Sequence, residues 1–434
     1  MSVTERAGKV LMVAYAFPPV GGAGVQRPAK FAKYLHRLGW DVWVLTASNP
    51  SVPVVDESLM KDVPDAVRIY RARTLEPSYR AKEKIAVKAN GRGGSKALLR
   101  RVVSACLIPD AQVLWWPGLV REFWKVVRQE RPDVVFVTAP PFSSLVAVAA
   151  VGRLLRVPVV VDFRDEWVFA RANIENAGKG FLPRFFDFWL ERATVKLCRK
   201  FTAATQGYVT SINERHPRAA RGKGVAITNG YDPEDFAGIT RQRQPDGIFR
   251  ILYTGTVWKA TSLKSFVETL MKAVGERPEL KNEIRLRIIG RIVDEEKPSL
   301  EPLEALGMVE IFGYRPHREV LQEMVDADLL LLTLSDLPGA ERIIPGKVFE
   351  YLATQRNILA LVPRGEVWNL IKDSPGVFCL TGAFSFLEVI QEVRQGLVVV
   401  TTDHSTFGRD SKAGQLCDVF GEIFMSEGQK CLMS

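Results

Sequence analysis

The sequence predicts an α/β fold made of two successive, doubly wound domains, and three observations support this prediction. The chain has 434 residues, more than one hydrophobic core usually serves. Short apolar runs alternate with helical patterns in both halves of the chain, as repeated βαβ units require. Between the halves, residues 221–246 contain the polar, turn-rich pieces GKG, NGYDPEDF and RQRQPDG.

The expected domain boundaries follow from that stretch. We expect a first Rossmann-like domain over residues 1–225, a linker over residues 226–246 and a second Rossmann-like domain over residues 247–400. Residues 401–434 form a C-terminal tail, in which the pattern indicates a helix over residues 412–424.

The first βαβ unit begins with the apolar run KVLMVA over residues 9–14, which indicates a buried strand because it ends at turn residues. A loop rich in proline and glycine follows. A helix is then expected over residues 28–38, with Gly39 as its left-handed cap. The run DVWVLT over residues 41–46 predicts the next strand.

The same alternation continues to the end of the second half. Further strands are expected over residues 133–138, 157–162 and 201–205, from residue 249, and over residues 285–290, 309–312, 328–334 and 358–362. The expected helices between them cover residues 143–155, 263–274, 318–326 and 347–354.

The composition excludes several classes of protein. Hydrophobic residues make up 47% of the chain and charged residues 25%, as in ordinary globular proteins. The polar start MSVTERAGK and the absence of a run of about 18 apolar residues predict neither a signal peptide nor a transmembrane helix. Five scattered cysteines without CxxC spacing argue against a disulfide framework or a zinc site and favour the cytoplasm.

The positive charge is concentrated in the first half. Residues 1–240 hold 36 Lys and Arg against 22 Asp and Glu, whereas residues 241–434 hold 23 against 27. Residues 80–101 alone contain eight basic residues and one acid. This distribution indicates an anionic partner. Three kinds fit: a nucleic acid, an anionic membrane surface or a phosphorylated substrate.

Three glycines stand between the first strand and the first helix: Gly21, Gly22 and Gly24. A strand-to-helix turn of this kind directs backbone N–H groups and a helix N-terminus at one place, which suits an anionic or hydroxyl-rich ligand. A purely structural turn is the alternative. The spacing fits neither Gly-x-Gly-x-x-Gly nor a P-loop.

The second half offers candidate phosphate ligands. Gly255 follows a predicted strand, and Lys259 and Lys264 come next, so either lysine is placed to meet a diphosphate unless it is simply a solvated surface residue. Further on, Lys347 lies at the start of a short helix and Glu350 one turn later. Lys347 is a second phosphate candidate and Glu350 a ligand for ribose hydroxyls, or the two form an ordinary ion pair.

Two pairs of charged residues lie at the ends of predicted strands or helices. Arg164 and Asp165 lie just beyond a strand end, where ligands of α/β proteins usually bind, with a helix cap or a local ion pair as the alternative. Asp326 and Asp328 have the Asp-x-Asp spacing of metal-dependent transferases. Because one ends a helix and the other opens an apolar strand, we expect a structural role and no metal site.

Seven stretches occur in the order seen in retaining glycosyltransferases of family four, which have the GT-B fold. They are FPPVGGAGVQRPAKFAKYLHRLGWDVWVLT, PDVVFVTAPP, VVDFRDEW, AITNGYDPEDF, ILYTGT, IFGYRP and GKVFEYLA. The sequence resembles most the branch that builds bacterial surface polysaccharides and lipopolysaccharide, and the resemblance covers residues 9–379.

The resemblance implies an active site in a cleft between two domains, with the nucleotide-sugar on the second domain, the acceptor on the first, and the last helix crossing back onto the first. It places the three glycines near the donor phosphates, Lys259 or Lys264 at the diphosphate, Glu350 at the ribose and Asn229 at the cleft.

The chain departs from the family pattern at two points. The family commonly has two glutamates eight residues apart, but the residue eight before Glu350 is Arg342, so either Glu341 takes over or Arg342 marks a different contact with the donor. A histidine common near VTAPPF is missing, so the loop with Arg164 and Asp165 is expected to take over acceptor contacts. Asp165 and Glu341 are therefore the candidate catalytic residues.

A membrane contact is also expected. Residues 95–108 read as a short basic, amphipathic helix, and Trp115 and Trp116 follow it, a combination that suits an anionic bilayer unless the helix simply packs on the first domain. Acceptors in this branch are often linked to polyprenyl diphosphate. The expected enzyme is thus cytoplasmic, and peripheral at the inner face of the cell membrane.

We therefore predict a retaining transferase of the hexosyl or N-acetylhexosaminyl type that uses a UDP- or GDP-sugar and needs no cofactor or metal. Two rivals remain open, a nucleotide-sugar 2-epimerase on the same fold and an inactive GT-B scaffold subunit. Nucleic-acid binding is not favoured, because the basic stretch lacks interleaved aromatic residues.

Overall fold

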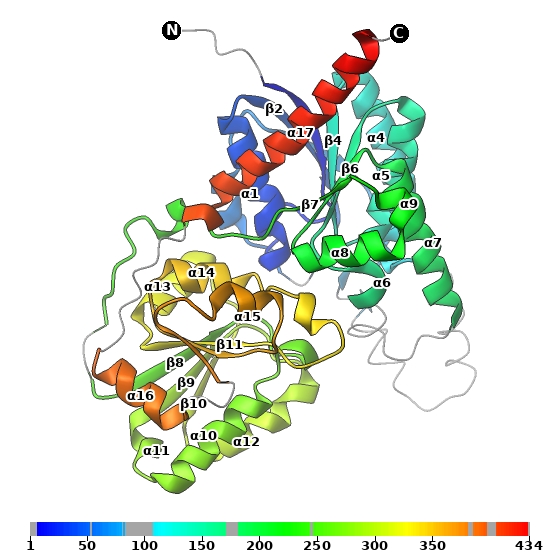
Figure 1. Cartoon of the computed structure of the whole chain (residues 1–434). Coiled ribbons are helices and arrows are strands. Elements are labelled where there is room, and N and C mark those ends of the chain that lie inside the picture. Colours follow the sequence, from blue (N-terminus) through cyan, green and yellow to red (C-terminus); the bar gives the residue numbers. More distant parts are fainter. Residues whose placement is uncertain are drawn as a thin grey trace. The chain divides into compact units, whose positions relative to one another are not determined.

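The computed structural model describes residues 7–52, 54–79, 81–82, 107–170, 181–243, 246–380, 385–396 and 405–432. They belong to two compact units (Figure 1). Unit 1 comprises Met1–Thr228 and Arg409–Ser434, and unit 2 comprises Asn229–Gly408. The chain thus enters unit 2 once and returns to unit 1 for its last helix.

Unit 1 contains a parallel sheet of seven strands in the order β3-β2-β1-β4-β5-β6-β7. The strands are β1 Gly8–Val13, β2 Trp40–Ala47, β3 Arg68–Ala72, β4 Val134–Ala139, β5 Val159–Phe163, β6 Lys200–Ala203 and β7 Gly224–Ala226. The helices are α1 Ala23–Arg37, α4 Trp116–Glu130, α5 Phe142–Leu155, α6 Trp167–Ala170, α7 Phe181–Leu197, α8 Gln206–Arg215, α9 Pro217–Ala220 and α17 Arg409–Leu432.

Unit 2 contains a parallel sheet of six strands in the order β10-β9-β8-β11-β12-β13. The strands are β8 Phe249–Thr254, β9 Ile284–Ile289, β10 Val309–Phe312, β11 Leu329–Thr333, β12 Ile358–Leu361 and β13 Val377–Cys379. The helices are α10 Lys264–Glu276, α11 Leu280–Glu283, α12 Glu301–Ala305, α13 His317–Asp326, α14 Lys347–Ala353, α15 Glu366–Ile371 and α16 Phe386–Arg394.

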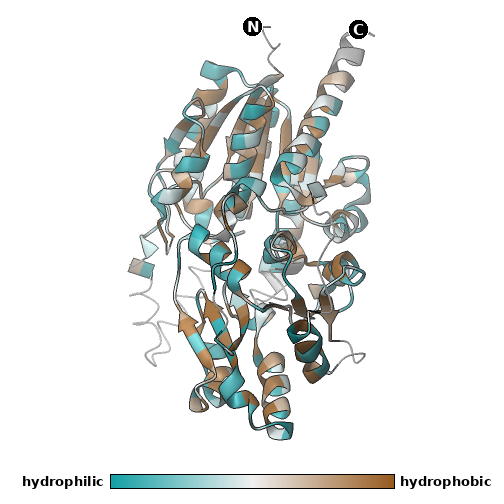
Figure 2. Ribbon diagram, turned by 90° about the vertical axis from the view of Figure 1, so that its left-hand side faces the viewer, coloured by the Kyte–Doolittle hydropathy of each residue, from teal (hydrophilic) through white to brown (hydrophobic). Residues whose placement is uncertain are grey.

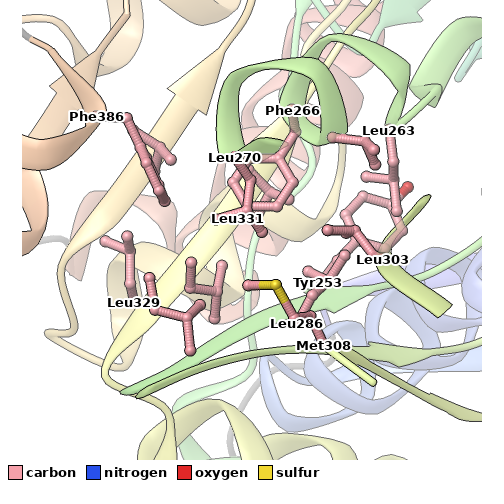
Figure 3. Packing of buried hydrophobic residues seen from close by; sticks show 14 of the residues in the cluster. Tyr253, Leu263, Phe266, Leu270, Leu286, Leu303, Met308, Leu329, Leu331 and Phe386 are labelled. Carbon is pink, nitrogen blue, oxygen red and sulfur yellow. The ribbon is translucent and has the colours of Figure 1, made fainter. Parts of the chain in front are cut away.

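In both units the hydrophobic cores lie on the two faces of the sheet, because helices cover the apolar side chains of a parallel sheet on both sides. Figure 2 shows apolar residues along the strands and more polar residues on the outer faces of the helices. In unit 2, Phe266 and Leu270 from α10 pack onto Leu286 of β9 and Leu331 of β11 (Figure 3). The predicted two-domain α/β fold is confirmed.

The strand order of each sheet defines one edge at which a ligand is expected to bind. In each sheet the chain first builds outward in one direction and then returns to build in the other, so the connections diverge between β1 and β4 and between β8 and β11. Ligands of doubly wound sheets bind beyond the carboxyl ends of the strands at this point. The Gly21–Gly24 loop follows β1, and Gly255 follows β8.

Helix α17, red in Figure 1, lies on α1 and returns the chain to unit 1, as predicted. It contributes Leu416, Val419 and Phe420 to the core of unit 1, and the Phe420 ring lies 5.1 Å from the ring of Trp40. The helix begins at Arg409, three residues before the predicted start.

Helix α1 begins at Ala23 rather than near residue 28, so Gly24 lies in its first turn and Pro28 inside it. A proline is tolerated there because the hydrogen bond that it cannot make falls close to the helix start, where the carbonyl finds another donor. The part of the chain that the structure describes contains no helix long and apolar enough to cross a membrane.

Candidate functional site

The glycine loop of unit 1 leads from β1 into α1. Gly22 has a φ of 101° and precedes the first helical residue, and no side chain caps the helix. That φ favours glycine over residues with a side chain. A methyl group on Gly22 would meet no atom within 4 Å, so the loop is open on this side. The first N–H groups of α1 are therefore placed to meet an anion.

Arg164 ties this loop to the end of β4. Its guanidinium donates to the carbonyl oxygens of Ala139 (2.9 Å), Pro140 (2.8 Å) and Gly24. The Gly24 carbonyl needs this donor because Pro28, four residues later, has no N–H to complete the helical bond. Arg164 therefore positions the loop, and its contact with an acceptor stays a prediction.

A buried ion pair between Arg27 and Asp162 anchors the helix that follows this loop. Arg27 of α1 donates to both carboxylate oxygens of Asp162 in β5, at 3.0 and 2.8 Å, and to backbone carbonyls of residues 227–228. Thr138 and Thr202 also donate to the carboxylate, each at 2.7 Å. Burial raises the pKa of Asp162, but the Arg27 charge and these hydrogen bonds hold it below its usual range.

Replacing Arg27 with methionine is expected to lower the free energy of unfolding by about 3–5 kcal/mol, because it leaves the buried Asp162 carboxylate without its countercharge. Urea unfolding followed by circular dichroism measures the change. Arg37→Met, at the exposed end of the same helix, is the matched control and should change the unfolding free energy by less than about 1 kcal/mol. Equal midpoints for the two variants would contradict the supporting role of the pair.

The tryptophans expected at a membrane surface are engaged elsewhere. Trp115 is fully buried, its Nε1 donates to the Ala72 carbonyl at 3.1 Å, and its ring packs edge-on against Tyr15. Trp116 is half-buried and donates to the Ser143 carbonyl at 2.8 Å. The prediction that Trp115 faces a bilayer is therefore wrong, because its indole completes the core. Residues 83–106, which carry most of the predicted amphipathic helix, lie outside the described residues.

In unit 2, two glycines bring the loops after β8 and β9 together. Gly255 has a φ of 106° and is exposed, and its N–H donates to the Ile289 carbonyl at 2.8 Å. A methyl group on Gly290 would lie 2.2 Å from the Gly255 carbonyl oxygen, so only glycine permits this approach. The backbone at Gly255 is thus fixed at the carboxyl end of β8.

Lys347 of α14 points at this loop. Its Nζ lies 3.7 Å from the centre of the Tyr253 ring, and a methyl group on Gly255 would lie 3.5 Å from it. The amine is buried and has no hydrogen-bond partner among the described residues. Burial lowers the pKa of Lys347 to about 7, although Glu350 opposes this shift. An anion that binds beside Gly255 would supply the missing countercharge.

Glu350, one turn along α14, faces His317 at the start of α13. The His317 Nε2 lies 3.8 Å from Glu350 Oε1 and 3.4 Å from Asp235 Oδ2. All three side chains are partly exposed, which leaves carboxylate oxygens accessible to hydroxyl groups. Neither His317 nor Asp235 was predicted to belong to the site.

Tyr351 fixes α14 against β8. Its buried hydroxyl accepts from the Thr254 N–H at 3.0 Å and lies 3.1 Å from the Thr254 hydroxyl. Because Tyr351 directly follows Glu350, this contact sets the position of both Lys347 and Glu350 relative to Gly255.

The remaining donor candidates in unit 2 are two lysines, Lys259 and Lys264, and two adjacent residues, Glu341 and Arg342. Lys264 is 71% exposed and lies 4.0 Å from Glu268 in an i,i+4 pair, and Lys259 is exposed at the start of a short 3₁₀ turn, Lys259–Thr261. Glu341 accepts from its neighbour Arg342 at 2.7 Å. Donor contact by any of these four stays a prediction.

Two predicted residues lie beside the loops described above. Asn229 lies next to Gly346, directly before α14, since a methyl group on Gly346 would be 3.9 Å from its Nδ2. Asp165 is exposed two residues beyond β5. The catalytic role of Asp165 stays a prediction.

The Asp-x-Asp pair is structural, as expected. Asp326 accepts from the backbone N–H groups of Gln242 and Arg243. Asp328 pairs with the side chains of Arg241 and Arg243 at 2.8 and 2.6 Å. The two carboxylates thereby hold residues 241–243 against the junction of α13 and β11.

The model of the glycosyl transferase 4-like domain matches residues 21–230, which run from the glycine loop to just beyond Thr228, where the first segment of unit 1 ends. Residues 21–230 are therefore similar to a glycosyl transferase 4-like domain, and the two doubly wound units have the arrangement of the GT-B fold. A comparison with curated proteins finds no significant match.

Solved structures with this fold are similar over nearly the whole GT-B chain. HepE from Anabaena, in complex with UDP-glucose, is 14% identical with a TM-score of 0.56 and covers 97% of this chain and 100% of its own. WaaG, a glycosyltransferase involved in lipopolysaccharide biosynthesis, is 15% identical with a TM-score of 0.56, covering 94% and 95%. A putative UDP-N-acetylglucosamine 2-epimerase from Listeria monocytogenes is 9% identical with a TM-score of 0.52, covering 96% and 97%. At sequence identities this low, the structural likeness shows a shared fold and nothing further.

Proposed function

We propose that this GT-B protein transfers a sugar, with retention of configuration, from a UDP- or GDP-sugar to a lipid-linked glycan during cell-surface polysaccharide biosynthesis. The observation that carries the proposal is the pairing of Lys347 with the Gly255 loop. A buried amine without a partner, next to an exposed glycine backbone at the carboxyl end of β8, matches the charge and the space that a diphosphate requires.

The roles of the unit 2 residues follow from that placement. Lys347 binds the diphosphate, Glu350 accepts hydrogen bonds from the ribose hydroxyls, and Tyr351 positions both. Glu341 and Arg342 lie on the segment before α14, where the donor sugar is held. The bound diphosphate leaves from the sugar carbon, and its oxygen takes the proton of the attacking hydroxyl while Lys347 stabilises the growing negative charge.

Unit 1 holds the acceptor in this proposal. The loop of Gly21, Gly22 and Gly24 is open at Gly22, where the first N–H groups of α1 begin, and Asp165 lies exposed at the same edge of the sheet. The resemblance of the chain to the polysaccharide and lipopolysaccharide branch supports a polyprenyl-diphosphate-linked acceptor. WaaG, which shares the fold, acts in lipopolysaccharide biosynthesis.

A nucleotide panel tests the donor assignment. We expect one of UDP and GDP to raise the melting temperature of the full-length protein by several degrees at 1 mM, because a ligand that binds only the native state stabilises it. ADP and CMP are the controls and should have little effect. Differential scanning fluorimetry and calorimetry measure the shift and the Kd. Equal, small shifts with all four nucleotides would contradict a nucleotide-sugar site and favour the inactive scaffold.

Incubation with the matching nucleotide-sugar separates transfer from epimerisation. A transferase releases the nucleoside diphosphate only when an acceptor is added and leaves unreacted donor with its original sugar. Conversion of the donor to its 2-epimer without acceptor would instead support the epimerase, whose fold this chain also shares.

A further inference from the structure

Helix α7 exposes a group of large aromatic side chains. Phe185, Phe186 and Trp189 are 47%, 43% and 48% exposed, although aromatic residues of this size normally bury most of their surface in a soluble protein. Phe185 and Trp189 are one helical turn apart, and their rings lie 6.1 Å from each other. Contiguous exposed apolar groups of this kind mark interaction surfaces.

The opposite face of α7 fixes its orientation. Asp187 and Glu191 point into unit 1, where both are buried. Asp187 accepts from the Trp167 indole at 3.2 Å, and Glu191 accepts from Arg215 and contacts His216 at 2.8 Å. Rotating the helix to bury its aromatic face would break these buried contacts, so the aromatic residues are held outward by the fold.

The acidic and the basic residues of α7 lie on opposite sides of the helix. Its acids are inside, whereas its basic residues lie on the outer side: Arg184 and Lys196 are exposed and Arg192 is partly exposed. The Arg192 guanidinium lies 5.4 Å from the centre of the Trp189 ring. Phe185, Trp189, Arg192 and Lys196 follow each other at helical spacing and so form one stripe, aromatic at one end and basic at the other.

We propose that this face of α7, formed by Arg184, Phe185, Phe186, Trp189, Arg192 and Lys196 and named here the α7 surface, docks on an anionic lipid bilayer. The inference deepens the proposed function, since it names the surface by which a transferase meets a lipid-linked acceptor. Aromatic rings insert at the headgroup level, and basic side chains reach anionic headgroups beside them.

Two observations favour a bilayer over a protein partner. Unit 1 as a whole holds 39 Lys and Arg against 23 Asp and Glu, a net charge of +16, whereas unit 2 holds 20 against 26, a net charge of −6. The attraction to an anionic surface is thus concentrated in the unit that carries α7. Three half-exposed aromatic side chains also offer only about 300 Å², well below the roughly 800 Å² per partner of a stable protein interface.

Vesicle cosedimentation of the full-length protein tests the inference. The wild type is expected to bind vesicles of phosphatidylglycerol and phosphatidylethanolamine, and not of phosphatidylcholine. The triple variant Phe185→Ser, Phe186→Ser, Trp189→Ser should bind about tenfold more weakly, and so should Arg184→Gln, Arg192→Gln, Lys196→Gln. Leu154→Ser, which changes a 67% exposed apolar residue of α5, is the matched control and should bind like the wild type.

Several outcomes would overturn the inference. These are a wild type that does not bind anionic vesicles, α7 variants that bind as well as the wild type, and a wild-type dimer that the aromatic variant converts to monomer in gel filtration. Each variant is first checked for a wild-type melting temperature and nucleotide affinity. Because the nucleotide site lies in unit 2, loss of vesicle binding with retained nucleotide affinity separates this inference from the proposed donor site.

Discussion

Replacing Lys347 with methionine is expected to weaken the affinity for the cognate nucleotide-sugar about 100-fold, with little loss of stability. A charge-assisted bond to a diphosphate contributes about 1.5–3 kcal/mol, and the unpartnered amine currently opposes folding by being buried without a hydrogen bond. Methionine has a similar length and suits the site over the Tyr253 ring. Isothermal titration calorimetry measures the affinity and thermal unfolding the stability.

The same lysine predicts a distinctive pH dependence. Its pKa of about 7 in the free protein means that the binding-competent, protonated form is lost as the pH rises through neutrality. Affinity for the nucleotide-sugar should therefore fall about 20-fold between pH 6.5 and 8.5, because the protonated fraction falls by that factor when the pKa is about 7. Bound diphosphate raises the pKa of the amine, so binding at pH 8 should be accompanied by proton uptake.

The control is Lys347→Arg, which keeps its charge at every pH in this range and should bind with an affinity that is nearly independent of pH. A nucleotide-sugar is the right probe, since free UDP or GDP has a terminal phosphate that titrates near pH 6. An affinity of the wild type that stays constant from pH 6.5 to 8.5 would show that the amine does not bind the donor.

The fold was predictable because its signals are local. Apolar runs such as KVLMVA at β1 and the polar stretch before β8 mark strands and a boundary without any knowledge of tertiary contacts. Gly255 and Lys347, 92 positions apart, were predicted as separate candidates, and the structure brings them together because parallel strands deliver their carboxyl ends to one edge. A residue at such an edge can be placed before its neighbours are known.

The environment of each side chain was not predictable in the same way. Trp115 looks interfacial in the sequence, yet it fills the core under β3 because residues that are distant in sequence, Ala72 and Tyr15, surround it. Likewise, only the buried partners of Asp187 and Glu191 reveal that α7 turns its aromatic side outward. Single-sequence patterns give the period of a helix, but the partners that orient it come from other elements.

Replacing Glu350 with alanine is expected to weaken nucleoside-diphosphate affinity about 30-fold, because a ribose hydroxyl bonded to a carboxylate contributes about 2 kcal/mol. The effect should depend on the ribose. A 2′,3′-dideoxy analogue of the cognate nucleotide should discriminate much less between the wild type and the variant, since it can form this bond with neither protein. Glu319→Ala on α13, where the carboxylate is 54% exposed, is the control and should bind like the wild type.

This comparison separates a ribose ligand from a residue that merely keeps Lys347 in place. If Glu350 acted only by raising the pKa of Lys347, to which it contributes, its loss would weaken the natural nucleotide and the dideoxy analogue by the same factor, and the deficit would shrink at pH 6. If it binds the ribose, the deficit is larger for the natural nucleotide than for the analogue and persists at pH 6. The position of Glu350 favours the second result, because its carboxylate is partly exposed beside His317, 3.8 Å away, where hydroxyl groups can reach it.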